Sequence, residues 1–111
     1  MRIWYRVSNL QAARAFYKEA LGFTETFVDE GERWATLDRD TTEIALGEGG
    51  VDQGEEGQVA TIDVDDVKAE RERLDQAGVD VGTVLELHGA MRLLDVFDPD
   101  GNRIQLAEEV V

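Results

Sequence analysis

The sequence predicts an α+β domain built from two tandem βαβββ units, in which a strand, a helix and three further strands follow one another. Three observations support this prediction. The chain opens with alternating apolar and polar residues, a helical apolar stripe follows directly, and the second half repeats the order of the first. With 111 residues, 42 % of them apolar, the chain can form one compact domain with a buried core.

The first unit starts with residues 2–7, which alternate and carry aromatic side chains, as expected of a strand. Ser8 and Gln11 form a capping-box pattern that predicts the start of a helix. The apolar stripe of this helix continues to Leu21, and Gly22 stands where a C-terminal cap belongs. Turn residues then separate three predicted strands, at 23–29, 32–38 and 41–47.

The second unit follows a glycine- and acid-rich stretch, residues 49–57, which we predict to be a surface linker. A strand is predicted at 59–64, and Asp65 or Asp66 then caps a helix that runs to Gly78. Three more strands are predicted near 81–87, 91–97 and 103–108.

An internal repeat links the two halves. Residues 7–10 align with residues 64–67 at an offset of 57, and residues 43–46 align with residues 103–106 at an offset of 60. Neither half can bury its sheet face alone, so the halves must pack against each other or against those of a second chain. The single domain, 1–111, therefore divides into module 1 (about 1–48), the linker (about 49–57) and module 2 (about 58–111).

The composition excludes several classes of partner and site. The chain has 25 acidic and 11 basic residues and a formal net charge of −14, which repels nucleic acid phosphates and anionic lipids. No apolar run is long enough to span a membrane, and the chain opens directly on strand-like sequence, so we expect a cytoplasmic protein. The absence of cysteine excludes disulfides and thiolate metal sites. His88 is the one histidine, and its place beside Gly89 predicts a surface loop residue rather than a catalytic one.

The acidity itself has two interpretations. It is typical of adaptation to a salt-filled cytoplasm, where high salt screens the self-repulsion, or of a surface that steers a cationic ligand. The acids are spread along the chain rather than clustered, which favours the first interpretation.

Alternation along the strands predicts which side chains face away from the helices. If these faces line one cup, it is a polar pocket with an aromatic wall, and we expect a small-molecule ligand to bind there. The predicted lining residues are Arg2, Trp4, Arg6, Glu43, Thr61, Asp63, Arg103 and Gln105. Trp4 and Trp34 either stack on a planar ligand or pack in the core or a dimer interface.

Two groups of residues carry a family resemblance. The first is Arg6-Val7-Ser8-Asn9-Leu10 with Phe16-Tyr17 and Leu21-Gly22-Phe23, and the second is Phe97-Asp98-Pro99-Asp100-Gly101-Asn102 with Ile104-Gln105-Leu106. They are similar to the opening and closing signatures of the vicinal oxygen chelate superfamily of glyoxalases, bleomycin resistance proteins and extradiol dioxygenases. The resemblance covers essentially the whole chain and implies paired βαβββ modules whose sheets curl into a cup, and a homodimer. It implies no single activity, because the family contains lyases, dioxygenases, isomerases, thiol transferases and antibiotic-binding proteins.

The resemblance also implies where metal ligands would stand. In the family's metal enzymes they come from the first and last strand of each module, which here gives Arg2, Ala45, Val59 and Gln105. Only Gln105 has a donor atom for a divalent ion, because arginine keeps its proton and alanine and valine have no donor. We therefore expect no metal and no other cofactor. Arg2 either replaces the metal as a fixed positive charge for an oxygen of the ligand, or pairs with Glu43, or is simply exposed near the terminus.

Several functions remain open at this stage. We favour a metal-free small-molecule binding protein of the bleomycin-resistance kind. The alternative is a metal-dependent lyase or dioxygenase of the glyoxalase type, similar to lactoylglutathione lyase, which requires different ligand positions. A metal-free lyase or isomerase that uses Arg2 with Glu43 or Asp63 as general base lies between them. A protein that has lost its ligand and works through protein contacts is a further alternative.

The charge balance gives a first testable prediction. We expect sodium chloride to raise the melting temperature by about 5 °C or more between low and molar salt, because screening weakens the self-repulsion of the acids. Differential scanning fluorimetry measures this, with sucrose as an uncharged control. A melting temperature that does not respond to salt would contradict adaptation to high salt and favour the cation-steering interpretation.

Overall fold

The computed structural model describes residues 3–31, 33–48 and 59–110. The described part of module 1 contains β1 (Ile3–Val7), α1 (Leu10–Glu19), β2 (Thr24–Asp29), β3 (Trp34–Arg39) and β4 (Thr42–Glu48). Module 2 contains β5 (Ala60–Asp63), α2 (Val67–Gln76), β6 (Asp80–Val81), β7 (Leu85–Leu87), β8 (Met91–Phe97) and β9 (Arg103–Glu109). This arrangement confirms the predicted α+β fold of two βαβββ modules; the predicted linker lies outside the described residues.

Each module forms a mixed sheet of its own. Sheet A has the order β1-β4-β3-β2, with β1 parallel to β4 and the other pairs antiparallel. Sheet B has the order β5-β9-β8-β6, with β5 parallel to β9, and β7 also pairs with β8. The strand predicted near 81–87 is therefore wrong as one element, because the chain leaves the sheet between β6 and β7. Its Gly82 still donates from its N–H to the carbonyl of Asp95 at 2.9 Å.

The helix starts follow a rule shared by both modules. Asn9 is the N-cap of α1, not Ser8 as the capping-box pattern predicted, and its side chain accepts from the N–H of Ala12. Asp66 caps α2 in the same way. A glutamate from the last strand of each module then accepts the first helical N–H: Glu48 from Leu10 at 2.8 Å and Glu108 from Val67 at 2.9 Å. The repeat thus extends to a latch between the last strand and the helix.

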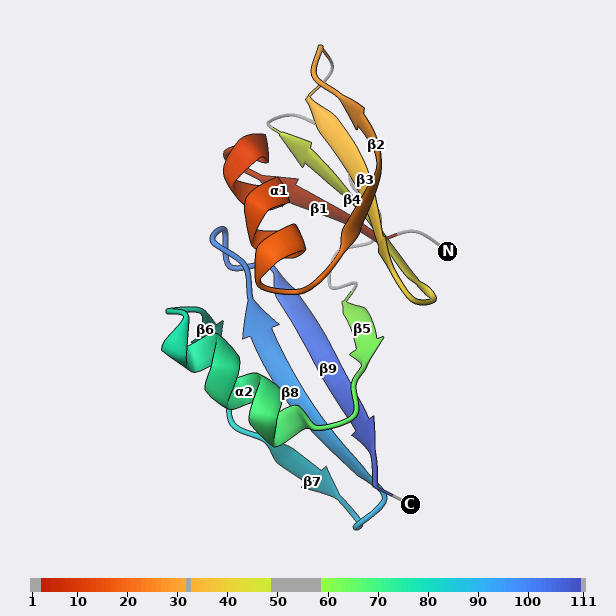
Figure 1. Ribbon diagram of the computed structural model, residues 1–111, viewed down its shortest axis with the longest axis vertical. Helices are drawn as coiled ribbons and strands as arrows, with labels where there is room; N and C mark the ends of the chain where they lie inside the picture. The colour runs from red at the N-terminus through yellow and green to blue at the C-terminus, as the bar shows by residue number, and fades with distance from the viewer. Residues whose placement is uncertain (1–2, 32, 49–58, 111) are drawn as a thin grey trace.

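The helices and the sheets form two layers. Both helices lie on the same side of the molecule, and the other side of both sheets carries no helix (Figure 1). Burying each large aliphatic side chain of the resulting core stabilises the fold by about 1.5–3 kcal/mol relative to its exposure. The sheet residues of this core include Tyr5, Val7, Leu37, Ile44, Leu46, Ile62, Leu94, Val96, Ile104 and Leu106, and the helices add Leu10, Ala13, Tyr17, Val67 and Leu74. Among the described residues, neither helix has the length and hydropathy needed to cross a membrane.

Two tyrosines of module 1 join the modules. The Tyr5 hydroxyl donates to the carbonyl of Arg103 at 2.6 Å and accepts from the N–H of Ala60 at 2.8 Å. The Tyr17 hydroxyl donates to Oδ2 of Asp98 at 2.8 Å, and the two phenol rings stack with centroids 6.2 Å apart. Burial, and then the charge of Asp98, raise the pKa of Tyr17 well above its ordinary value. This phenol therefore keeps its proton and acts as a donor.

Asp98 in turn organises the turn that the sequence Asp98-Pro99-Asp100-Gly101 predicted. Its Oδ1 accepts from the N–H of Asp100 and of Asn102 at 2.9 and 2.8 Å. Asn102 closes the network, because its Nδ2 donates to Oδ2 of Asp98 and to the carbonyl of Arg6. A buried carboxylate of module 2 is thus satisfied by its own turn and by module 1 together.

The buried phenol gives a second prediction. We expect Tyr17→Phe to lower the free energy of unfolding by about 1–3 kcal/mol, because Asp98 loses a buried donor. Urea denaturation in high salt measures the change. Thr42→Val is the control: it removes a more accessible bond across the same junction, from Thr42 Oγ1 to the carbonyl of Thr61, and should cost less than about 0.5 kcal/mol. Equal losses in the two variants would contradict a special role for Tyr17.

An ion-pair cluster near the surface connects α1 to β2. Glu25 accepts from Nε and Nη2 of Arg14 at 2.6 and 3.0 Å, and Nζ of Lys18 lies 3.0 Å from its Oε1. Arg14, with a smaller contribution from Lys18, lowers the pKa of Glu25 to about 2. The cluster therefore favours the ionised carboxylate in the folded state.

This shift makes stability depend on pH. The pKa of Glu25 is lower in the folded than in the unfolded chain, so its contribution is complete above about pH 4.5 and is lost as the pH falls towards 2. We expect Glu25→Gln to cost about 1 kcal/mol at pH 7, a value reduced for solvent screening, and clearly less at pH 3. Denaturant titrations at both pH values test this, with Glu72→Gln on the exposed face of α2 as the charge-matched control. A loss that is the same at both pH values would contradict it.

Candidate functional site

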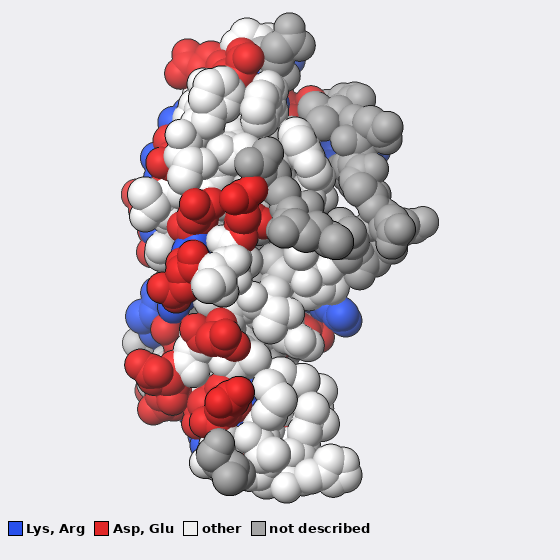
Figure 2. All heavy atoms as spheres, turned by 90° about the vertical axis from the view of Figure 1, so that its right-hand side faces the viewer, with Lys and Arg blue, Asp and Glu red and all other residues white. Residues whose placement is uncertain are grey.

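Strand alternation separates a helix face from an open face on each sheet. Tyr5 and Val7 of β1 are buried towards α1, whereas Trp4 and Arg6 point to the open side. Residues opposite each other in neighbouring strands share a face, so the register extends this division across the sheet. The open faces of both sheets lie opposite the helices (Figure 1). In the side view of Figure 2, most of the visible acidic atoms lie along one edge of the molecule.

An aromatic cluster covers the open face of sheet A. The ring of Trp34 lies 5.8 Å from that of Trp4 and 5.0 Å from that of Phe27, measured between centroids. In the register, Trp4 lies opposite Ala45, Ala45 opposite Thr36, and Thr36 opposite Phe27. Ala45 is 0 % and Thr36 4 % exposed, although both point away from the helix layer. The rings therefore cover the centre of this face.

The next row of the same face is acidic. Asp38 lies directly opposite Glu43 on the antiparallel strands β3 and β4. Oδ1 of Asp38 is buried and, within the part of the chain that the structure describes, has no hydrogen-bond partner. Two carboxylates thus border the aromatic cluster, and one of their oxygens lacks the donor that a buried polar atom normally has.

The open face of sheet B is polar in the middle and apolar at one end. Gln105 lies between Thr61 and Asp95 in the register, and the Arg103 guanidinium lies 3.8 Å from Asp95. The apolar end consists of Leu85, Leu87, Met91 and Leu93, which pair across β7 and β8. Leu85 is 56 % and Leu87 41 % exposed, so this end is an uncovered apolar surface.

The predicted cup residues are divided between the two sheets. Trp4, Arg6 and Glu43 lie on the open face of sheet A, and Thr61, Asp63, Arg103 and Gln105 lie on that of sheet B; Arg2 lies outside the described residues. The two modules meet where Thr42 bonds to the carbonyl of Thr61. The sheets lie one beyond the other rather than face to face (Figure 1), so the two faces form an open surface within one chain.

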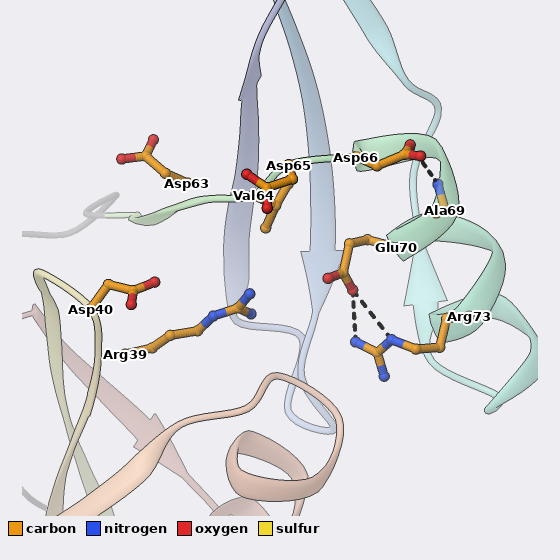
Figure 3. Close-up of a pocket in the computed structure, with 9 residues that line it drawn as sticks. All are labelled: Arg39, Asp40, Asp63, Val64, Asp65, Asp66, Ala69, Glu70 and Arg73. Carbon is orange, nitrogen blue, oxygen red and sulfur yellow. Dashed lines mark hydrogen bonds and ion pairs between the residues drawn. The ribbon is translucent and has the colours of Figure 1, made fainter.

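A pocket of about 420 Å³ lies between the modules, beside this surface. Asp40 and Asp63 lie on one side of it, Arg39 reaches across it, and Glu70 and Arg73 of α2 lie opposite (Figure 3). Several of its charged groups serve the fold. The guanidinium of Arg39 donates to the carbonyl of Leu21, and that of Arg73 donates to the carbonyl of Ala20 and to Glu70. The pocket is therefore a structural junction in large part, and Asp63 is the predicted site residue that lines it.

The positions that the family resemblance assigns to metal ligands do not fit a metal. Ala45 has no donor atom and is fully buried, and Val59 has no donor atom either. Gln105 offers one neutral amide oxygen, on the other sheet. Among the described residues, the structure places no group of three or more histidine, cysteine, aspartate or glutamate side chains that could hold a metal ion.

Sequence reasoning missed Phe27 and Asp38. Asp38 follows from the alternation that relates it to Thr36 and Trp34, so the sequence carried the signal for it. Phe27 did not follow, because a bulge between Glu25 and Phe27 shifts the register of β2 by one residue. The loop position predicted for His88 is confirmed: it is exposed in the turn between β7 and β8, with a φ of 52°.

Comparisons with known proteins agree with this architecture. A model of the Glyoxalase/Bleomycin resistance protein/Dioxygenase superfamily matches residues 2–106, which is nearly the whole chain. No curated protein matches the sequence.

Several solved structures share the fold. TnmS3, an antibiotic binding protein from Streptomyces sp. CB03234, superposes with a TM-score of 0.78 at 26 % identity, over 97 % of this chain and 93 % of that one. Lactoylglutathione lyase from Agrobacterium tumefaciens gives a TM-score of 0.79 at 19 % identity, over 97 % and 91 %. A bleomycin resistance determinant encoded on the transposon Tn5 gives 0.74 at 18 % identity, over 100 % and 98 %. An antibiotic binding protein, a resistance determinant and a lyase thus share this fold, so the side chains of the site must decide the function.

Proposed function

The chain belongs to the glyoxalase/bleomycin resistance protein/dioxygenase superfamily, and we propose that it binds a small molecule on the open side of its sheets without a metal ion. The proposal places it with the drug-binding members of the family rather than with the metal-dependent lyases and dioxygenases. The ligand would contact Trp4, Arg6 and Glu43 on sheet A and Thr61, Asp63, Arg103 and Gln105 on sheet B. Arg2, which lies outside the described residues, remains a predicted contact from the sequence.

One observation carries this proposal. The rings of Trp4, Trp34 and Phe27 form one cluster on the face of sheet A that also carries the buried Ala45, a position where the family's metal enzymes have a ligand. Aromatic side chains with exposed edges on a concave or open face are typical of small-molecule binding, because they offer large apolar area with little loss of conformational entropy. Phe27 is 49 % exposed and contacts Trp34, so this part of the aromatic cluster is open to solvent.

We further propose a homodimer in the cytoplasm. The exposed apolar end of sheet B, formed by Leu85, Leu87, Met91 and Leu93, supports a second copy that covers it. The sequence contains no cysteine, as suits a reducing compartment. Closure of the binding face by the second copy would complete the cup that one chain leaves open.

The metal content of the purified protein tests the proposal first. We expect less than about 0.1 metal ion per chain in protein purified in high salt without chelators or a histidine tag, and no tight binding of nickel, zinc or manganese, because the donor set is inadequate. Near-stoichiometric metal that Gln105→Ala releases, and that the surface control His88→Ala retains, would instead indicate a metal-dependent enzyme. Glyoxalase and dioxygenase assays would follow.

Ligand binding can be followed without labels. Both tryptophans of the chain, Trp4 and Trp34, lie on the proposed binding face, so intrinsic fluorescence reports on it alone. We expect planar small molecules to quench this fluorescence with saturation, and Phe27→Leu to weaken them by about 5-fold or more through lost stacking. Phe16→Leu on α1, away from the open face, is the matched control.

A further inference from the structure

We propose that the open face of sheet A selects a flat aromatic ring system that carries a positive charge. This inference rests on the proposed function, because it names the class of ligand for the same binding face. It depends on the aromatic cluster, the carboxylates beside it and the unpartnered oxygen of Asp38.

The aromatic cluster determines the shape of the ligand. Trp4, Trp34 and Phe27 are in mutual contact in the order Trp4–Trp34–Phe27, with centroid distances of 5.8 and 5.0 Å. Their interplanar angles of 37° and 44° make a tilted, continuous aromatic surface rather than a flat stack. A ring system that lies on this surface contacts several π-faces at once, and a positive charge on it gains from their quadrupoles.

The neighbouring row determines the charge of the ligand. Asp38 and Glu43 lie opposite each other, one register step along from the pair Thr36 and Ala45 that the rings cover. On the described strands of sheet A, the open face carries three carboxylates, from Asp29, Asp38 and Glu43, and one guanidinium, from Arg6. The carboxylate of Asp38, whose Oδ1 has no hydrogen-bond donor in the described part of the chain, would repel an anionic ligand and attract a cation.

Asp38 is the residue to which we assign this attraction. Oδ1 of Asp38 is buried without a hydrogen-bond partner in the described part of the chain. The side chain of Asp38 is half-buried, so the rest of its carboxylate reaches the surface beside the rings, and no donor among the described residues offsets the charge on Oδ1. An N–H⁺ group of the ligand is therefore attracted to this carboxylate. The aromatic surface holds the ring, and Asp38 holds the charged nitrogen.

Three probes separate shape from charge. Proflavine is a planar aromatic cation near pH 7.5, acridine is its neutral planar counterpart, and spermidine is a cation without a ring. Isothermal titration calorimetry in about 0.5 M sodium chloride screens attraction to the remote acids of this strongly negative chain. We expect proflavine to bind at least ~10-fold more tightly than acridine, and spermidine to bind weakly, because a charge-assisted hydrogen bond contributes about that factor.

Two variants on sheet A and one control on α2 assign the effect to residues. Asp38→Asn keeps the shape of the side chain and relieves its repulsion with Glu43, and it should weaken proflavine about 10-fold while leaving acridine unchanged. Asp75→Asn on the exposed side of α2 removes one charge far from sheet A and should change neither probe. Phe27→Leu, at a half-exposed ring, should weaken both planar probes.

The outcomes distinguish the role of charge, the role of the rings and the proposed function. Equal affinity for proflavine and acridine, or an Asp38→Asn protein that still prefers proflavine as Asp75→Asn does, would overturn the selection of a cation and leave small-molecule binding intact. Absence of binding by both planar probes, together with bound metal in the purified protein, would overturn the proposed function itself. Spermidine binding as tight as proflavine would show that charge alone acts and would overturn the role of the rings.

Discussion

The contact of Tyr5 and Tyr17 with module 2 is the constraint on which the rest of the structure depends. Each module is a small sheet with one helix, too thin to bury both of its faces alone. The Tyr5 hydroxyl bonds to the backbone of both β5 and β9, and Tyr17 bonds to Asp98, which organises the turn before β9. These bonds lie in the shared core, so they set the angle between the modules. That angle places the two open faces on one side of the molecule, where a ligand can reach both.

The division of the side chains into two faces was predictable from sequence because it follows from the period of a strand. The alternation of Ile3, Tyr5 and Val7 with Trp4 and Arg6 is written directly in the order of residues, and the internal repeat carries it to module 2. The capping residue was less predictable. Ser8 and Asn9 are both good caps, and the backbone N–H of Ser8 instead donates to Asp100 of the distant turn between β8 and β9. A contact across 92 positions leaves no local signal.

The candidate site, too, could be predicted only where local sequence determines it. Each predicted cup residue that the structure describes lies on an open face, but its distance to the others depends on how the sheets meet, which no period reveals. A bulge between Glu25 and Phe27 shifts the register and places Phe27 in the aromatic cluster. The amino-acid sequence around Phe27 does not reveal that shift. The lack of metal ligands was easier to predict from sequence, because it depends only on which atoms each side chain has. Alanine and valine lack donor atoms in any register, and the structure adds that Ala45 is covered.

The latch between Glu48 and α1, and between Glu108 and α2, shows that the two modules have kept one scaffold while their open faces have diverged. Superposing the repeat pairs Trp4 with Thr61 and Ala45 with Gln105. It also pairs Arg6 with Asp63 and Glu43 with Arg103, so the sign of the charge is reversed at both positions. Two modules with the same backbone plan thus carry different side chains at equivalent positions of their open faces. A molecule that spans both halves meets a different arrangement of charges on each half, so its two possible bound orientations are not equivalent.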